Sequence, residues 1–143
     1  MELDGVKLND VIEAFELFDD WEDRYKYIID LARKLPTFPE EKRQNEFKVR
    51  GCVSQVWIAP QWSNEHPSKF YFDGDSDAHI VKGLVALMVL IFAGKTAPEI
   101  LATDARTIMT KLGLSEHLSP MRTNGLFSMI EKKEKVLLLL DSN

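Results

Sequence analysis

The first third of the chain repeats apolar residues with the spacing of an α-helix. Apolar side chains recur three or four residues apart over residues 8–18 and again over 21–35, which predicts two amphipathic helices. One of the two aspartates at 19–20 is placed to cap the second helix, and Pro36 is expected to end it. Residues 39–42, which begin with proline, predict one short further turn.

The middle of the chain has the period of two that is typical of strands. β-Branched and aromatic residues predict short strands at 47–49, 53–60 and 69–72, and Asp73-Gly74 is expected to end the last of them as a turn. Strands so close in sequence pair most simply as antiparallel neighbours. We therefore expect a three-stranded antiparallel sheet, with Cys52 at or near its first hairpin.

The remainder of the chain predicts helices with recognisable ends. The expected helices are 78–93, capped by Asp77 and ended by Gly94; one opened by the capping box at 96–99; 104–112, ended by Gly113; and a last one from 119 towards 140. Helices around one small sheet predict the α+β class. We expect a two-layer sandwich, with a small three-stranded antiparallel sheet flanked by helices, in a single domain over residues 1–143.

Composition narrows the classes of function. With a net charge of −5, the chain lacks the basic surface of a general nucleic-acid binder, and an apolar content of 45% is enough for a core. The longest apolar run, 84–93, is too short to span a bilayer, and the N-terminus does not resemble a signal peptide. A single cysteine indicates a reducing compartment, so we expect a cytoplasmic protein that binds neither membranes nor nucleic acid.

Cys52 is the only cysteine and the first candidate for chemistry. A free cysteine is usually a small, buried, inert residue. Here Gly51 allows a turn, and Lys48 and Arg50 place positive charge nearby, which favours the thiolate. These residues alone leave the inert and the reactive interpretations equally weighted.

Other candidates have plain structural explanations. The acidic run 73–77 weakly resembles a calcium loop but lacks its spacing, so a turn followed by a helix cap is favoured. The three histidines are too widely separated in sequence to predict a metal site. His79 could serve a cysteine-dependent enzyme as its general base, although nothing local supports that role. Arg122 lies in a first helical turn, where it either pairs with an anion or is simply solvated.

Four segments occur in order along the chain: WEDRYKYII at 21–29, GCVSQVW at 51–57, GDSDAHIVKGL at 74–84 and LSPMRTNGL at 118–126. Together they resemble the SufE-like sulfur-acceptor family, whose members include SufE and CsdE, and the resemblance covers nearly the whole chain. The chain departs from common family forms at Val53, where many members have glutamine, and at Arg50. Both departures bear on the polarity and charge beside the cysteine and leave the thiol in place.

The resemblance implies a function. It implies that the protein takes sulfur onto Cys52 from the persulfide of a cysteine desulfurase of the SufS or CsdA kind. It also implies that the protein stimulates that enzyme and passes the sulfur to an iron–sulfur cluster scaffold complex. It implies supporting or partner-contact roles for Gly51, Gln55, Asp77 and Arg122. It also implies a fold like that of the scaffold protein IscU, with no cofactor and no metal.

Such a protein is a persulfide carrier and desulfurase activator, an accessory protein rather than an autonomous enzyme. The alternative is a cysteine-dependent enzyme that acts on a small substrate with a histidine base. The sequence leaves open the SufE or CsdE branch, the exact partners and self-association into a weak homodimer.

Overall fold

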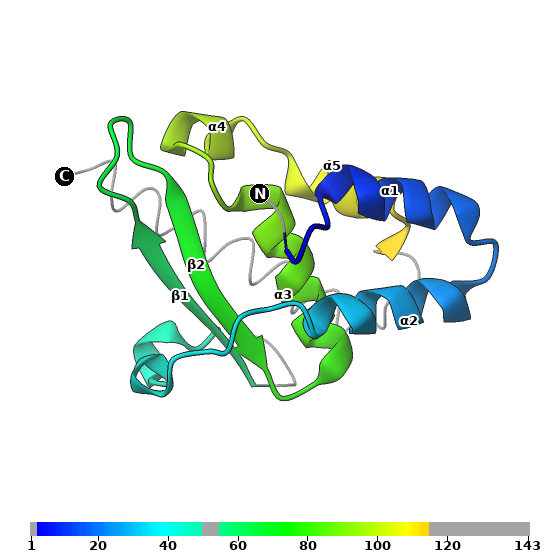
Figure 1. Ribbon diagram of the computed structural model, residues 1–143, viewed down its shortest axis with the longest axis horizontal. Coiled ribbons are helices and arrows are strands. Elements are labelled where there is room, and N and C mark those ends of the chain that lie inside the picture. Colours follow the sequence, from blue (N-terminus) through cyan, green and yellow to red (C-terminus); the bar gives the residue numbers. More distant parts are fainter. Residues whose placement is uncertain (1–2, 50–54, 115–143) are drawn as a thin grey trace.

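The computed structural model describes residues 3–49 and 55–114, in which helices pack against a two-stranded antiparallel sheet (Figure 1). Helix α3 lies against the inner face of the sheet, and α2 packs on α3. The elements in order are α1 (Leu8–Leu17), α2 (Trp21–Ala32), the 3-10 turns η1 (Glu40–Lys42) and η2 (Asn45–Phe47), β1 (Val56–Trp62), β2 (Phe70–Ser76), α3 (His79–Phe92), α4 (Ala97–Leu101) and α5 (Ala105–Lys111).

The helices predicted from apolar spacing are confirmed within the described residues. Asp20 caps α2, where its carboxylate accepts a hydrogen bond from the Glu22 N–H at 2.9 Å, and Thr96 opens α4 with the expected capping box. Helix α2 ends at Ala32 rather than at Leu35. The N–H groups of residues 33–35 bond to carbonyls three residues back, so the last turn tightens beyond α-helical geometry.

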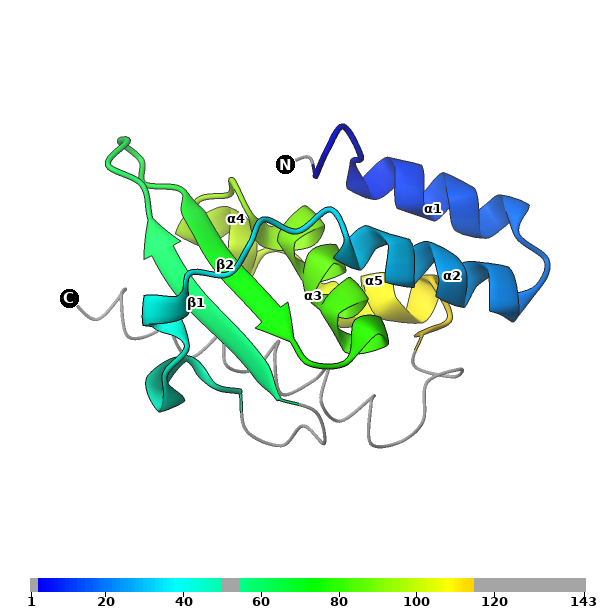
Figure 2. The same cartoon turned by 60° about the horizontal axis from the view of Figure 1, so that its bottom comes forward.

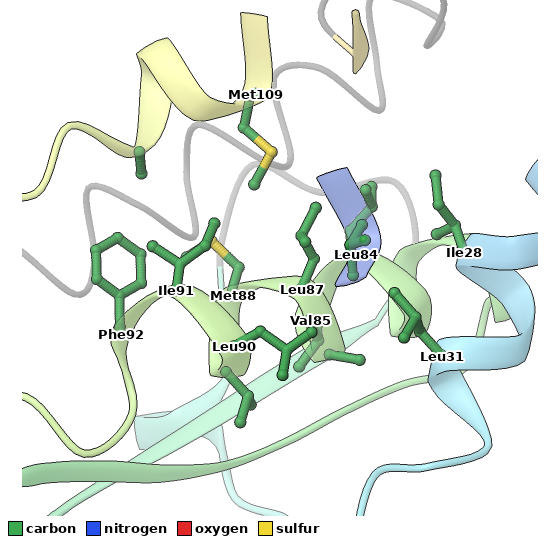
Figure 3. Close-up of a cluster of buried hydrophobic side chains, with 14 of the residues drawn as sticks. Ile28, Leu31, Leu84, Val85, Leu87, Met88, Leu90, Ile91, Phe92 and Met109 are labelled. Carbon is green, nitrogen blue, oxygen red and sulfur yellow. The ribbon is translucent and has the colours of Figure 1, made fainter. Parts of the chain in front are cut away.

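Helix α3 forms the centre of the core. All of its residues except His79 and Lys82 are buried, which is typical of a helix that is apolar on every side (Figure 3). Gly83 lets α2 approach closely, because a Cβ at this position would overlap the backbone carbonyl and side chain of Ile28. Within the described residues, no helix is both long and apolar enough to cross a membrane.

The sheet has two strands in the described part of the chain, so the prediction of three strands is wrong there. The segment expected to form the first strand contributes one isolated bridge, between Lys48 and Trp57. The residues just before it, Asn45–Phe47, form the 3-10 turn η2 instead of extended backbone. The last predicted helix, 119–140, lies outside the described residues.

Strand β2 also runs further than predicted. Asp73-Gly74 does not end the strand as a turn, because β2 continues to Ser76 and pairs Gly74 with Ile58 and Asp75 with Trp57. Gly74 is buried on the face towards α3, where a Cβ would overlap Val85. Glycine here permits close packing of helix on sheet rather than a change of chain direction.

Candidate functional site

Two of the five site residues predicted from the sequence lie in the described chain, and they contact each other. The Gln55 N–H donates a hydrogen bond to Asp77 Oδ1 at 3.0 Å, and the Asp77 N–H donates to the Gln55 carbonyl at 3.2 Å. The other three, Gly51, Cys52 and Arg122, lie outside the described residues, so their predicted roles stay predictions.

Asp77 is not the N-cap of α3, contrary to the sequence-based expectation. The N-cap is Ala78, whose N–H donates to the Ser76 hydroxyl at 3.2 Å. The Asp77 carboxylate instead accepts from the N–H of Gln55, the residue before β1, because a backbone hydrogen bond just past the end of the strand pairing brings the two residues together. The tendency of an aspartate carboxylate to accept a hydrogen bond from a backbone N–H is therefore satisfied by Gln55 rather than by an N–H of the helix.

The residues that precede Cys52 in the sequence contact the start of β1, next to Gln55. The Val49 N–H donates to the Val56 carbonyl at 2.8 Å, and Lys48 bridges Trp57. Residues 50–54, which we call the cysteine segment, therefore lie in sequence between two positions that the sheet fixes next to each other. This arrangement of Val49, Gln55, Val56 and Asp77 is the base of the cysteine segment.

Ion pairs cover the outer face of β2 near this base. Lys42 Nζ lies 2.9 Å from the Asp73 carboxylate, and Arg43 lies 2.8 Å from that of Asp75. Lys82 of α3 adds a third contact, 3.4 Å from Asp75. Burial alone would raise the pKa of Asp75, but the hydrogen bonds from Arg43 and the Ser76 N–H, with the charge of Lys82, hold that pKa below its ordinary value.

Sequence reasoning missed these ion pairs. It assigned the acidic run to a turn and a cap, whereas Asp73 and Asp75 extend from one face of a continuous strand. Their spacing of two residues is a signal that the strand extends further. The alternative of a calcium loop gains no support, since among residues 3–49 and 55–114 no group of three or more acidic, histidine or cysteine side chains is placed to hold a metal.

An arginine joins these acids to the aromatic residues of the same face. The guanidinium carbon of Arg43 lies 4.6 Å from the centre of the Trp57 ring and 5.0 Å from that of Phe38. Of the histidines in the described chain, His79 is the one near the base: it is exposed at the first position of α3, two residues after Asp77.

Comparisons with known proteins identify chains that are similar to this one. Residues 9–136 match the SufE family, described as an Fe-S metabolism associated domain. An uncharacterised SufE-like protein of Rhizobium etli is 50% identical over 126 residues, which cover 87% of this chain and 85% of the relative. Another uncharacterised SufE-like protein, of Rhizobium meliloti, is 49% identical over 126 residues, covering 87% of this chain and 90% of the relative.

A solved structure shares the fold. The solution structure of a hypothetical protein from Thermus thermophilus superposes with a TM-score of 0.75, covering 95% of this chain and 96% of that one at 18% identity. At that identity the likeness concerns the fold alone. The family match over most of the length and the relatives at about half identity carry the assignment: the chain belongs to the SufE family, whose domain is associated with iron–sulfur metabolism.

Proposed function

We propose that this chain is a sulfur acceptor and carrier that works on Cys52. In this proposal a cysteine desulfurase of the SufS or CsdA kind donates the sulfur, the chain stimulates that enzyme, and an iron–sulfur scaffold complex receives the sulfur. The chain acts in the cytoplasm as a single domain over residues 1–143. Membership of the SufE family supports the proposal in its general form.

The observation that carries the proposal is the position of the only cysteine. Cys52 lies in the sequence between Val49 and Gln55, and both of these are tied by hydrogen bonds to the same end of the sheet. A reactive thiol between two fixed points can be offered to a partner without disturbing the core. Gly51 would give the backbone freedom beside the thiol, and Arg122 would serve the partner contact or the sulfur anion.

The chemistry is a sulfur exchange without net oxidation. The thiolate of Cys52 attacks the outer sulfur of the donor persulfide, a new S–S bond forms on Cys52, and the S–S bond of the donor breaks. The donor cysteine leaves as a thiolate, and the proton of the outer sulfur stays with it on Cys52. Because the sequence has no second cysteine, no internal thiol can attack the new persulfide and release it as sulfide.

The test is a mass measurement after incubation with a cysteine desulfurase and cysteine. The wild-type chain is expected to gain the mass of one sulfur atom, which a reductant removes, and Cys52→Ser is expected to gain nothing while keeping its fold. Sulfur bound by the serine variant would contradict the assignment of Cys52.

The rival interpretation, a cysteine-dependent enzyme, is kept because His79 is exposed close to Asp77. An acceptor needs no imidazole as a base for a small substrate, so His79→Ala is expected to accept sulfur at the wild-type rate. Loss of sulfur acceptance in this variant, with the fold intact, would favour the rival.

A further inference from the structure

The segment that leads into the cysteine segment lies on the outside of the sheet. Residues 38–49, here called the connecting segment, carry the short turns η1 and η2 and lie beside β1, on the side away from α3 (Figure 2). Most of its polar residues are exposed. Two neighbouring cations, Lys42 and Arg43, make the ion pairs to β2.

Arg43 makes far more contacts than a surface cation usually does. Its guanidinium donates to Asp75 Oδ2 at 2.8 Å and to the carboxylate of Glu40 at 3.3 Å, and it lies over the rings of Trp57 and Phe38. Only 28% of its side chain is exposed, and only 17% of that of Asp75. Among the described residues, the ion-pair partner of Lys42 is Asp73.

The contact set needs the shape of arginine. A planar guanidinium can lie flat on aromatic rings and still donate from its edge to a carboxylate, whereas the ammonium of lysine offers a single compact charge. Asp75 is largely buried, so its carboxylate depends on the donors that surround it, and Arg43 supplies the shortest of the side-chain contacts.

Trp57 connects Arg43 to the base of the cysteine segment. On one side Trp57 pairs with Asp75 of β2, and on the other it bridges Lys48 of the connecting segment. Val56, next to Trp57, and Val49, next to Lys48, form the hydrogen bond that holds the two ends of the cysteine segment together. A change at Arg43 therefore reaches the base through Trp57 and through the connecting segment at once.

We infer that Arg43 is a positioning residue for sulfur transfer, which sets the geometry of the base through Trp57 and Asp75. This inference rests on the proposed function, since it concerns the rate at which Cys52 accepts sulfur. In this role Arg43 acts through Trp57 and Asp75 and supplies no proton. Small errors of position in a reacting group lower rates steeply, up to about a hundredfold for a displacement of about 1 Å, so the effect belongs in the transfer step.

The experiment compares wild type with Arg43→Met, Arg43→Lys and the control Lys42→Met. Each chain is mixed with a persulfide-loaded cysteine desulfurase at increasing concentration, and the sulfur on Cys52 is followed by mass in a single turnover. This separates the maximal rate from the donor concentration that gives half of it. Thermal unfolding of each variant is measured beside the kinetics.

Arg43→Met is expected to lower the maximal rate about tenfold without moving the half-saturating concentration, and Arg43→Lys to give an intermediate loss. Lys42→Met, which removes an ion pair of the same segment, is expected to transfer at the wild-type rate. If Arg43→Met does not fold, the lysine variant keeps a charge for Asp75 and carries the test.

Three results would overturn the inference: wild-type kinetics in both Arg43 variants, equal losses in Arg43→Met and Lys42→Met, or a change confined to the half-saturating concentration. The last would make Arg43 a contact for the partner. If the wild-type chain itself takes no sulfur, the proposed function fails. If it does and both Arg43 variants match it, only the positioning role fails.

Discussion

Removal of the Asp77 carboxylate should loosen the base of the cysteine segment by a measurable amount. Asp77→Ala deletes the acceptor for the Gln55 N–H but keeps the second hydrogen bond, which the Asp77 backbone N–H donates to Gln55. Hydrogen bonds to charged groups contribute about 1.5–3 kcal/mol, and both residues are exposed, so water replaces part of the loss. We expect a net cost of about 1 kcal/mol, which corresponds to about a fivefold larger population in which the remaining hydrogen bond between residues 77 and 55 is open.

The hydrogen bond from the residue 77 amide to the Gln55 carbonyl is present in both chains, so hydrogen exchange of the residue 77 amide, followed by NMR and corrected for its intrinsic rate, measures that population. Asp77→Ala should speed the exchange of this amide about fivefold, while amides in the middle of α3 keep their rates because the core is untouched. Asp77→Asn keeps an oxygen acceptor of the same shape and serves as the matched control, with a smaller increase expected. An unchanged exchange rate for the residue 77 amide in the alanine variant would show that the carboxylate does not hold this strand end.

Two further predictions concern the scaffold beneath the site. Gly83→Ala should lower the free energy of unfolding in urea by about 2 kcal/mol, because the new methyl group would overlap the carbonyl of Ile28, which cannot move without moving α2. This loss is expected although alanine favours helices over glycine by about 1 kcal/mol. Equal or higher stability of the variant would refute this packing. The ionised carboxylate of Asp75 should stabilise the fold at pH values above its ordinary pKa of 3.8, and this effect should be lost as the pH falls through the lower pKa of the folded state. When the urea concentration at the midpoint of unfolding is plotted against pH, Asp75→Asn should therefore show a shallower fall at acid pH than wild type. Parallel curves would contradict the ion-pair network.

The helices were predictable from the sequence because their signals are local. Apolar spacing, the carboxylate of Asp20, the capping box at Thr96 and the left-handed glycine Gly94 each act within one or two turns of chain, so tertiary contacts had little to override. The end of α2 was placed three residues late, since the tightening of a last turn leaves no mark in the apolar pattern.

The strands were predicted less well because their signals depend on pairing. Asp73-Gly74 has the composition of a turn, yet the burial of Gly74 against Val85 keeps it inside β2. Lys48 fits an extended pattern, yet it makes only one bridge after the η2 turn. Which neighbour a strand residue meets is decided by contacts distant in sequence, and a period of two does not specify them.

The site shows the same limit more sharply. Gln55 and Asp77 were singled out by resemblance to a family, and no local pattern indicated that their backbones meet across 22 positions of sequence. Arg43 was not singled out at all, because a cation next to another cation in a polar segment is ordinarily solvated. Its importance rests on Asp75 and Trp57, which lie on two different strands.

The acidic run connects these observations. Asp73 and Asp75 stand at alternate positions of β2, so the extended strand turns both towards the same side of the sheet, and Asp77 follows just past the end of the strand. Asp73 pairs with Lys42, Asp75 pairs with Arg43, and Asp77 accepts the N–H of residue 55. The first two acids hold the connecting segment that enters the cysteine segment, and the third holds the strand end that leaves it. One short stretch of β2 and the residue that follows it thus contact both sides of the base, so a substitution at Asp75 or Asp77 is expected to alter sulfur acceptance by Cys52 before it affects the core.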